Sequence, residues 1–227
     1  MSAHTIISSL ISRIKKEDFK LDERIPISYL IHFFIFKTIS LINGFVRFRK
    51  VVFISTNVIL RCKNKMKFGT NVCIDRGCFL DALSENGILL GNNVSMGKFT
   101  TIECTGSMKS LGKGIKVGNN VGLGTHGFLG CAGGIEIGND VIIGNYVTMH
   151  SENHNYSQNS LPIRLQGVNR KGIKIGNDCW IGAKVTILDG AEIGNGCIIA
   201  AGAIVKGKFP PESIIGGIPA RVIRSRF

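Results

Sequence analysis

The chain has 227 residues, of which 44% are hydrophobic, 29 are Gly and 5 are Pro, and its formal net charge is +13. This apolar content supports a continuous buried core, which excludes intrinsically disordered and collagen-like proteins. Residues 1–67 contain 13 Lys/Arg and 4 Asp/Glu, so most of the net positive charge lies in less than a third of the chain. We therefore expect an anionic partner for this part, either a membrane surface or a phosphate-bearing substrate. No nucleic acid is expected, because the basic residues are not interleaved with aromatic ones in a known binding motif.

The N-terminal unit, residues 1–50, is predicted to be helical. Apolar residues recur at helical spacing over residues 2–24, and Pro26 marks a boundary before the apolar stretch 27–46. His32, Lys37 and Asn43 interrupt that stretch, which favours a helix lying on an apolar surface over a full membrane span. That surface is either the rest of the protein, including a neighbouring subunit, or the inner face of an anionic membrane as a peripheral contact.

Residues 51–208 follow a six-residue repeat, in which an aliphatic residue recurs at every sixth position and usually precedes Gly. Examples are Ile137, Ile143, Ile175, Ile181 and Ile187. A period of six fits neither a helix nor a flat strand, but it fits a three-sided coil of eighteen residues with the aliphatic side chains inside. Gly133 and Gly134 shift the repeat by two residues. Residues 209–227 are expected to close the coil.

Seven Cys are scattered through the chain, and none of them forms a C-x-x-C pair. An odd number of thiols embedded in a repeat indicates free cysteines in a reducing compartment, so we expect a cytoplasmic protein. Cys179 and Cys197 are eighteen residues apart and take the same small inward position of the repeat. They are therefore expected to stack in the core.

The repeat between about Phe68 and Phe227 resembles that of the hexapeptide-repeat acyltransferases. The resemblance implies an all-β fold, a left-handed parallel β-helix with an N-terminal helical segment. The handedness comes from the resemblance alone, because parallel crossovers are normally right-handed. The resemblance also implies a homotrimer with sites between subunits and acetyl-CoA as the acyl donor.

A polar excursion at residues 150–172 interrupts the repeat and contains His150, Glu152 and His154. Long polar insertions in an economical fold are usually functional, and an imidazole is the natural proton acceptor near neutral pH. In the sugar O-acetyltransferases that this chain resembles, a His of this loop is the general base. Counting seventeen residues from Ile137, as the family pattern does, gives His154. His150 and Glu152 are possible supporting residues.

Three further groups of residues match motifs of the resembling family. Trp180 stands in a Trp-Ile-Gly motif that lies near the active site in those enzymes. Small residues of the closing repeats line their coenzyme A channel, and basic residues meet the nucleotide phosphates. The corresponding residues here are Trp180, Ala183 and Ala201 for the donor or acceptor, and Lys206, Lys208, Arg221 and Arg224 for the phosphates.

The sequence thus predicts an acetyl-CoA-dependent O-acetyltransferase that acts, without a metal, on a sugar hydroxyl of a surface glycan or its precursor. Small-sugar enzymes of the family carry an acceptor-binding Asn where this chain has Gly124, so the acceptor is not transferable from them. An N-acetyltransferase acting on an amino sugar or another amine is the alternative. Two more distant alternatives are a metal-dependent hydratase using His150, His154 and His126, and a non-catalytic scaffold.

Overall fold

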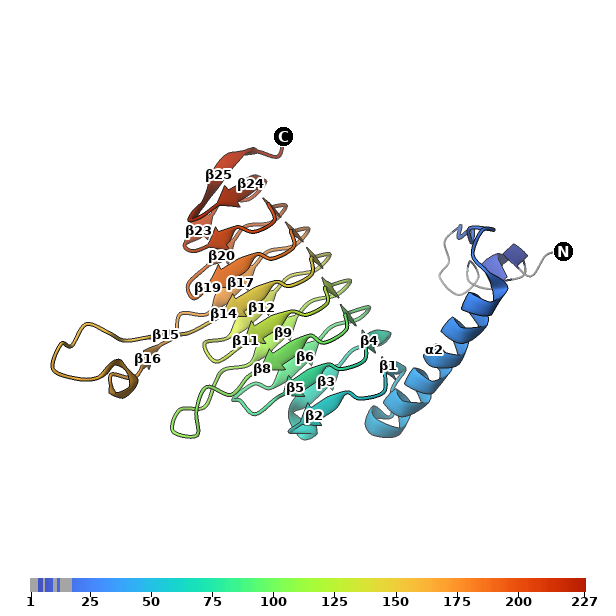
Figure 1. Ribbon diagram of the computed structural model, residues 1–227, viewed down its shortest axis with the longest axis horizontal. Helices are drawn as coiled ribbons and strands as arrows, with labels where there is room; N and C mark the ends of the chain where they lie inside the picture. Colours follow the sequence, from blue (N-terminus) through green and yellow to red (C-terminus); the bar gives the residue numbers. More distant parts are fainter. Residues whose placement is uncertain (1–3, 6, 10–11, 13–17) are drawn as a thin grey trace.

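The computed structural model describes residues 4–5, 7–9, 12 and 18–227, and it consists of one long helix followed by a three-sided coil of parallel strands (Figure 1). Helix α2 (Ile27–Phe48) confirms the helix predicted over the apolar stretch 27–46 and extends it by two residues. Of the helix expected over residues 2–24, residues 4–5, 7–9 and 12 are helical, whereas residues 18–24 form an irregular segment and a turn, so the prediction is wrong for that part; the other residues lie outside the described ones. The coil is left-handed and confirms the predicted fold class.

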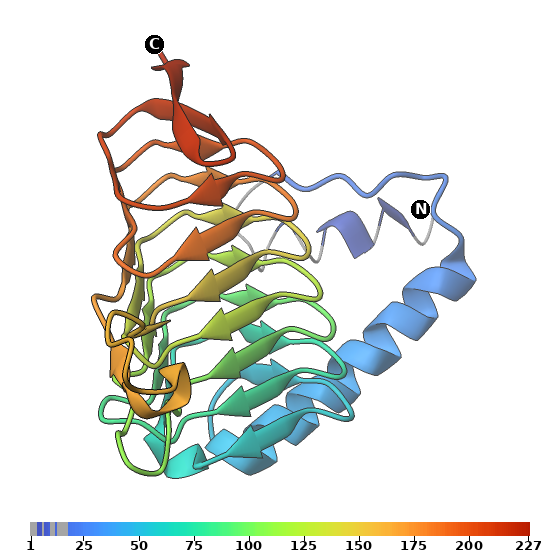
Figure 2. The same cartoon turned by 60° about the vertical axis from the view of Figure 1, so that its left-hand side comes forward.

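Each side of the coil is a parallel sheet, and Figures 1 and 2 show the three sheets stacked along one axis. Sheet A consists of β1 (Val52–Ile54), β4 (Val72–Ile74), β7 (Ser95–Met96), β10 (Gly122–Leu123), β13 (Ile142–Ile143), β18 (Trp180–Ile181), β21 (Ile198–Ile199), β24 (Ser213–Gly217) and the antiparallel β25 (Ala220–Ser225). Sheet B consists of β2 (Ile59–Arg61), β5 (Phe79–Asp81), β8 (Thr101–Glu103), β11 (Phe128–Gly130), β14 (Thr148–His150), β19 (Thr186–Leu188) and β22 (Ile204–Val205). Sheet C consists of β3 (Met66–Phe68), β6 (Ile88–Leu90), β9 (Ile115–Val117), β12 (Ile135–Ile137), β17 (Ile173–Ile175), β20 (Glu192–Ile193) and β23 (Lys208–Phe209), and the short helix η1 (Lys63–Lys65) precedes it.

The core is a set of columns formed by the inward residue of each strand. In sheet B, Leu129 pairs with Met149, Met149 with Ile187, and Ile187 with Val205, and each of these side chains is buried. Parallel strands buried in this way are apolar at every inward position, which is why the six-residue repeat predicts the core so directly. Cys179 and Cys197 are both buried at successive levels, as expected.

The length of one turn of the coil is not constant. Trp180 pairs with Ile198, eighteen residues on, but Ile115 pairs with Ile135, which is twenty residues on. The eighteen-residue turn expected from the repeat therefore holds from β17–β19 to β20–β22. It is wrong for the earlier turns and also for the last one, in which Ile198 pairs with Ile214, sixteen residues on. The two additional residues in the turn that ends at Ile135 correspond to the predicted shift at Gly133 and Gly134. Gly134 has a φ of 95°, a left-handed conformation that glycine adopts without strain.

The two ends of the coil are covered differently. At the first turn, the C-terminal half of α2 packs on β1, where Gly44 lies so close to the Val52 carbonyl that a Cβ would overlap it. The Phe48 and Phe68 ring centroids are 4.7 Å apart at the same end. At the last turn, β24 and β25 form an antiparallel hairpin. Helix α2 and the β24–β25 hairpin thus cover or pair the strand edges that would otherwise be exposed at the two ends of the coil.

Candidate active site

The polar excursion folds into a hairpin that projects from the coil at the corner between sheets B and C (Figures 1 and 2). Strand β15 (Asn153–His154) runs antiparallel to β16 (Val168–Asn169), and His154 pairs with Val168. The short helix η2 (Ile163–Leu165) lies toward the hairpin tip. We call residues 150–172 the hairpin. Its strand pairing places His154 on the ordered stem of the hairpin.

A buried carboxylate holds the stem to the coil. Asp189 follows β19 and is only 4% exposed. Its Oδ1 accepts hydrogen bonds from the backbone N–H groups of Lys171 and Gly172 at 2.8 and 2.7 Å, and its Oδ2 accepts one from Asn153 Nδ2 at 3.2 Å. Charge-assisted bonds of this kind are short and strong. Asp189 therefore fixes both arms of the hairpin, including the residue next to His154.

Arg170 forms a second anchor. Its Nε donates to Glu152 at 3.0 Å, and its Nη1 donates to Ser110 Oγ and the Leu111 carbonyl at 3.1 and 2.9 Å. These contacts tie the hairpin to the loop of residues 105–114. Glu152, a possible supporting residue for the base, thus directs its carboxylate to Arg170.

The His154 ring is exposed and makes no hydrogen bond to any residue that the structure describes. His150 is also exposed and ends β14, where its ring centroid is 5.6 Å from that of Phe128. The two imidazoles therefore differ: His150 packs against Phe128 on sheet B, whereas His154 is exposed on the stem of the hairpin. Over residues 4–5, 7–9, 12 and 18–227, no three His, Cys, Asp or Glu side chains gather as a metal site would require.

A second cluster occupies sheet A and its corner with sheet B. Trp180 is 56% exposed on β18, between Ile142 and Ile198 of the neighbouring turns. Ala183 and Ala201 lie exposed at the corner, one turn apart. Small side chains leave the corner backbone accessible, so an extended ligand can lie close along it.

The same corner carries an aromatic stack that the sequence did not reveal. The ring centroids of Phe99 and His126 are 5.1 Å apart, and those of His126 and Tyr146 are 4.9 Å apart with an interplanar angle of 20°. All three residues have positive φ values at equivalent turn positions, and Lys184 takes this position in the next turn. His126 is therefore part of a stack at the corner, away from the hairpin.

The four basic candidates lie on three parts of the coil. Lys206 follows β22 at the corner between sheets B and C, whereas Arg221 and Arg224 are exposed on β25. Lys208 lies on sheet C and pairs with Glu192 at 2.9 Å. One chain therefore does not gather these four side chains at a single point.

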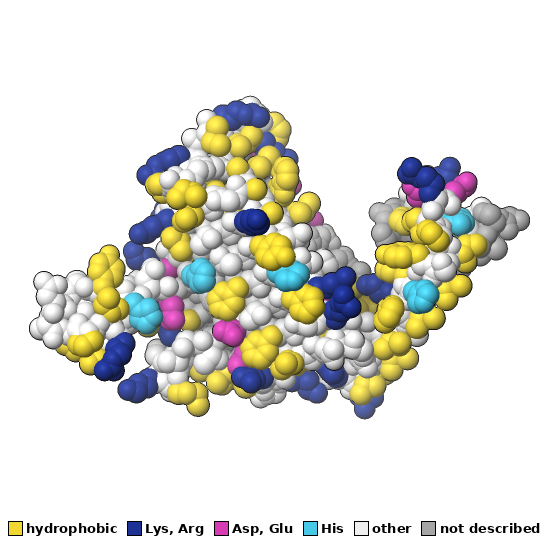
Figure 3. All heavy atoms as spheres, viewed as in Figure 1, with side chains coloured by type: hydrophobic (Ala, Val, Ile, Leu, Met, Phe, Trp, Pro, Cys, Tyr) yellow, Lys and Arg dark blue, Asp and Glu magenta, His cyan; other side chains and the backbone are white. Residues whose placement is uncertain are grey.

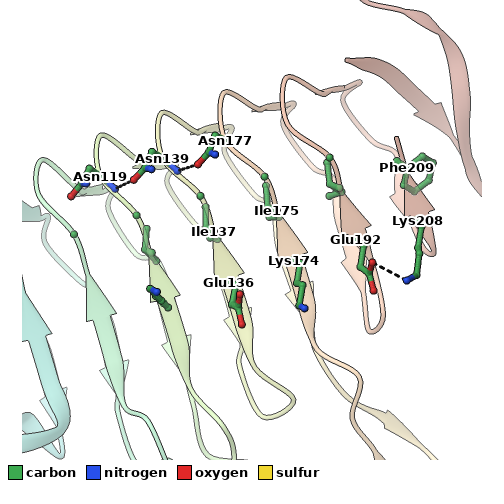
Figure 4. Close-up of a pocket in the computed structure, with 18 of the residues that line it drawn as sticks. Asn119, Glu136, Ile137, Asn139, Lys174, Ile175, Asn177, Glu192, Lys208 and Phe209 are labelled. Carbon is green, nitrogen blue, oxygen red and sulfur yellow. Dashed lines mark hydrogen bonds and ion pairs between the residues drawn. The ribbon is translucent and has the colours of Figure 1, made fainter. Parts of the chain in front are cut away.

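Sheet C is hollowed by an open groove of ≈ 1040 Å³ (Figure 4). Its floor alternates in charge along the coil axis, from Lys116 through Glu136, Lys174 and Glu192 to Lys208. The rim is an asparagine ladder, in which Asn139 Oδ1 accepts from the Asn119 N–H and Asn177 Oδ1 from the Asn139 N–H, each at 2.8 Å. Opposite charges in successive strands neutralise one another, so the groove is polar but has no strong net sign.

The predicted site residues thus form two groups within one chain. His150, Glu152 and His154 belong to the hairpin, and Trp180, Ala183 and Ala201 belong to sheet A and its corner with sheet B. The hairpin leaves the coil at a different corner and points away from it (Figure 1). The chain alone does not bring the predicted base next to the predicted donor residues.

Comparison with known proteins agrees with this architecture. Residues 172–207 match the family model described as bacterial transferase hexapeptide (six repeats). A probable acetyltransferase of Mycobacterium tuberculosis, Rv3034c, is 39% identical over 92 residues, which cover 40% of this chain and 31% of that protein. The putative lipopolysaccharide biosynthesis O-acetyl transferase WbbJ of Escherichia coli is 26% identical over 172 residues, which cover 73% of this chain and 74% of WbbJ. The galactoside O-acetyltransferase of Escherichia coli is 36% identical over 94 residues, which cover 40% of this chain and 43% of that enzyme.

Among solved structures, the N-acyltransferase AntD from Bacillus cereus shares the fold, with a TM-score of 0.54 and 20% identity over 78% of this chain and 80% of AntD. The matched segment spans only about a third of Rv3034c, although it spans most of WbbJ. The repeat, the family model over residues 172–207 and these relatives all show similarity to the hexapeptide-repeat acyltransferases. The predicted resemblance is thereby confirmed, and the names of these relatives agree with the predicted enzyme class, an acyltransferase.

Proposed function

We propose that the protein is an acetyl-CoA-dependent O-acetyltransferase that esterifies a sugar hydroxyl of a surface glycan or its precursor, with His154 as the general base. The observation that carries this proposal is the anchored hairpin: Asp189 fixes its stem, while the His154 ring stays exposed and free of hydrogen bonds to the described residues. An imidazole held in this way is ready to accept a proton from a substrate. The long match to WbbJ, which is named for lipopolysaccharide biosynthesis, supports a glycan acceptor.

The chemistry is a direct transfer. The His154 ring takes the proton of the attacking hydroxyl while the sugar oxygen forms a bond to the thioester carbonyl carbon. A backbone N–H stabilises the resulting oxyanion. When the intermediate collapses, the carbon–sulfur bond breaks and the coenzyme A sulfur receives the proton from the imidazolium. The products are the acetyl ester and free coenzyme A, and the imidazole is neutral again.

The thiols of the core are poor candidates for a covalent acetyl intermediate. Burial raises the pKa of Cys78 and of Cys179 to about 11, and it raises the pKa of Cys131 well above its ordinary value. These three groups are therefore protonated near neutral pH, whereas the thiolate is the nucleophilic form. Direct transfer needs none of them.

We further propose that the site is completed in a homotrimer. The hairpin projects away from its own coil, and the donor residues lie at another corner. In a threefold arrangement, the hairpin of one subunit lies across the sheet A–B corner of the next. Trp180, Ala183 and Ala201 then border acetyl-CoA, and Lys206, Lys208, Arg221 and Arg224 are the proposed contacts of its phosphates. A related donor, 3-hydroxybutyryl-CoA, is bound in AntD.

Transfer to an amine is the alternative, because the same base and donor serve either nucleophile. AntD is named as an N-acyltransferase, so the fold accommodates that chemistry. A matched pair of acceptors separates the two: a sugar and its amino-deoxy analogue at the same carbon. We expect acetyl-CoA consumption with the hydroxyl acceptor and an ester located by mass spectrometry. Turnover with the amino sugar only, giving an amide, contradicts O-acetylation.

The base is tested by His154→Asn, with His32→Asn as the matched control. His32 is an exposed histidine of α2, away from the hairpin. We expect kcat to fall by about 10²–10⁴-fold in the first variant and to remain unchanged in the second. Circular dichroism and size-exclusion chromatography check that both variants fold and assemble alike. Full activity of a folded His154→Asn variant contradicts the proposed mechanism.

A further inference from the structure

Helix α2 exposes far more apolar surface than its packing on the coil explains. Its C-terminal half contacts the first two turns of the coil through Lys37, Gly44 and Phe48, whereas the helix surface that faces away from the coil is exposed in the part of the chain that the structure describes. The residues at helical spacing on that surface are Ile31, Ile35, Ile39, Ile42 and Val46, which are 41–65% exposed. We call these five residues the outer ridge. Phe33, Phe34, Phe36 and Phe45 flank it and are also exposed.

We propose that α2 lies in the surface layer of an anionic membrane, with the outer ridge among the lipid acyl chains and the coil held on the aqueous side. A helix that is apolar on nearly all its exposed faces requires an apolar environment. Figure 3 shows hydrophobic side chains along the whole of α2, with Lys and Arg side chains where the helix meets the coil. The inference concerns location alone and does not depend on the acceptor or on the catalytic base.

Charge next to the helix identifies the kind of membrane. Residues 47–67 contain seven Lys/Arg and no Asp/Glu. This basic segment includes the end of α2 and the first turn of the coil, and Lys63 Nζ lies 5.9 Å from the Phe48 ring centroid. Basic residues beside an interfacial helix bind anionic headgroups and favour the cytoplasmic leaflet.

The single charge in the middle of the helix does not oppose this placement. Lys37 points to the coil, where its Nζ is 3.5 Å from Cys73 Sγ and 5.1 Å from the Phe53 ring centroid. The ammonium group is therefore on the side of α2 opposite the outer ridge. It is held by the protein and stays out of the lipid.

The packing of α2 on the coil favours a helix that lies parallel to the membrane surface over one that crosses the membrane. Within the described residues, α2 is the one helix long and apolar enough to cross a membrane, and 22 residues extend for about 33 Å. However, the first turn of the coil packs beside its C-terminal half, so an upright helix would carry the polar Thr56–Asn57 turn into the hydrocarbon layer. Irregular backbone exposed to lipid is not tolerated there. An in-plane helix avoids this cost.

The test is flotation of the full-length protein with vesicles of phosphatidylcholine containing phosphatidylglycerol, compared with phosphatidylcholine alone. We expect flotation with the anionic vesicles and release by alkaline carbonate, which strips interfacial but not spanning proteins. Absence of flotation overturns the proposal, and retention after carbonate overturns the in-plane placement. Both measurements are made without acyl donor or acceptor, so they fail or succeed independently of the proposed activity.

Two variants test separately whether vesicle binding depends on the outer ridge of α2 and on the basic residues beside it. Ile39→Asn/Val46→Asn removes two residues of the outer ridge and should abolish flotation, whereas the control Met108→Asn/Ile223→Asn changes two exposed apolar residues elsewhere and should float normally. Lys63→Gln/Lys67→Gln should weaken binding to anionic vesicles about thirtyfold, because each basic residue near the surface contributes to the attraction. If the ridge variant still floats, the inference is wrong. If it instead yields a smaller assembly in lipid-free buffer, the ridge is covered by a second copy of the chain and the membrane proposal is overturned.

Discussion

The coil and the hairpin are stabilised in opposite ways. In the coil, each inward residue rests on equivalent residues of the turns before and after it, as Ile187 does between Met149 and Val205. The hairpin has no such repetition, and its stem depends on two anchors, Asp189 and Arg170. The contacts that stabilise the coil are therefore distributed over many buried residues, whereas those that stabilise the hairpin involve a few polar residues. His154, the proposed base, belongs to the hairpin.

The largest effect is expected from a cavity in the coil. Ile187→Ala removes a fully buried side chain between two other buried ones, so it should lower the free energy of unfolding by about 2–5 kcal/mol. Urea unfolding followed by circular dichroism measures the change. The matched control is Ile142→Ala, because Ile142 lies on the outer face of sheet A and is 65% exposed. An equal loss of stability in both variants would contradict the assignment of Ile187 to the core.

The inward-facing core residues could be predicted from the sequence because the six-residue repeat identifies each of them from its near neighbours in the chain. Within each uninterrupted run of the repeat every sixth residue is apolar, and Ile137, Ile175 and Ile187 are all buried as expected. The anchors could not be found in this way. Arg170 and Ser110 are 60 residues apart, and Asp189 occurs in an Asp-Gly pair that resembles an ordinary turn.

The aromatic stack was hidden by the uneven length of the turns. Phe99, His126 and Tyr146 stand 27 and 20 residues apart, and neither separation is a multiple of six, so they do not look equivalent in the sequence. Only the paired strands show that they lie one above another. The position of His154 in the hairpin followed from the count of seventeen residues from Ile137, because that distance contains no irregular turn, and its role as the base stays a prediction. The residues around His154 in an oligomer depend on how the subunits are arranged. A local sequence pattern in one chain does not predict that arrangement.

Substitution of the hairpin anchor Asp189 should lower stability less than Ile187→Ala does, but it should lower activity more. Asp189→Ala leaves the N–H groups of Lys171 and Gly172 without their acceptor, which should cost about 1–3 kcal/mol and loosen the stem. Trypsin should then cut faster after Arg164, within the hairpin, while the coil remains intact. Turnover should fall because His154 is no longer held in place.

Asp189→Asn serves as the conservative control for this anchor. Its side-chain oxygen can still accept from the two backbone N–H groups, so it should restore most of the protease resistance and part of the turnover. A position needed only for folding would give parallel losses of stability and activity in both variants. If Asp189→Ala leaves trypsin cleavage after Arg164 unchanged, the hairpin is held by other contacts and the comparison with the coil fails.

The smallest effect is expected from alkaline pH, which should lower the stability of the coil but leave the hairpin unchanged. Burial raises the pKa of Cys78 and Cys179 to about 11, above the ordinary thiol value of 9.0 that applies in the unfolded chain. Between these values the unfolded state releases protons that the folded state retains, so stability falls as the pH rises from about 9 to 11. After allowance for partial solvation, each thiol should contribute about 1 kcal/mol to this loss.

Urea midpoints measured at pH 8 and pH 10.5 check the prediction for the thiols. Cys179→Ala should be less stable than the wild type at pH 8, because it removes buried volume, but its stability should decline less steeply with pH. Residues 150–172 contain no cysteine, so trypsin cleavage at the hairpin, assayed at pH 8 after incubation at pH 10.5, should be unaltered. An identical decline with pH in the wild type and in Cys179→Ala would show that other groups govern the alkaline stability of the coil.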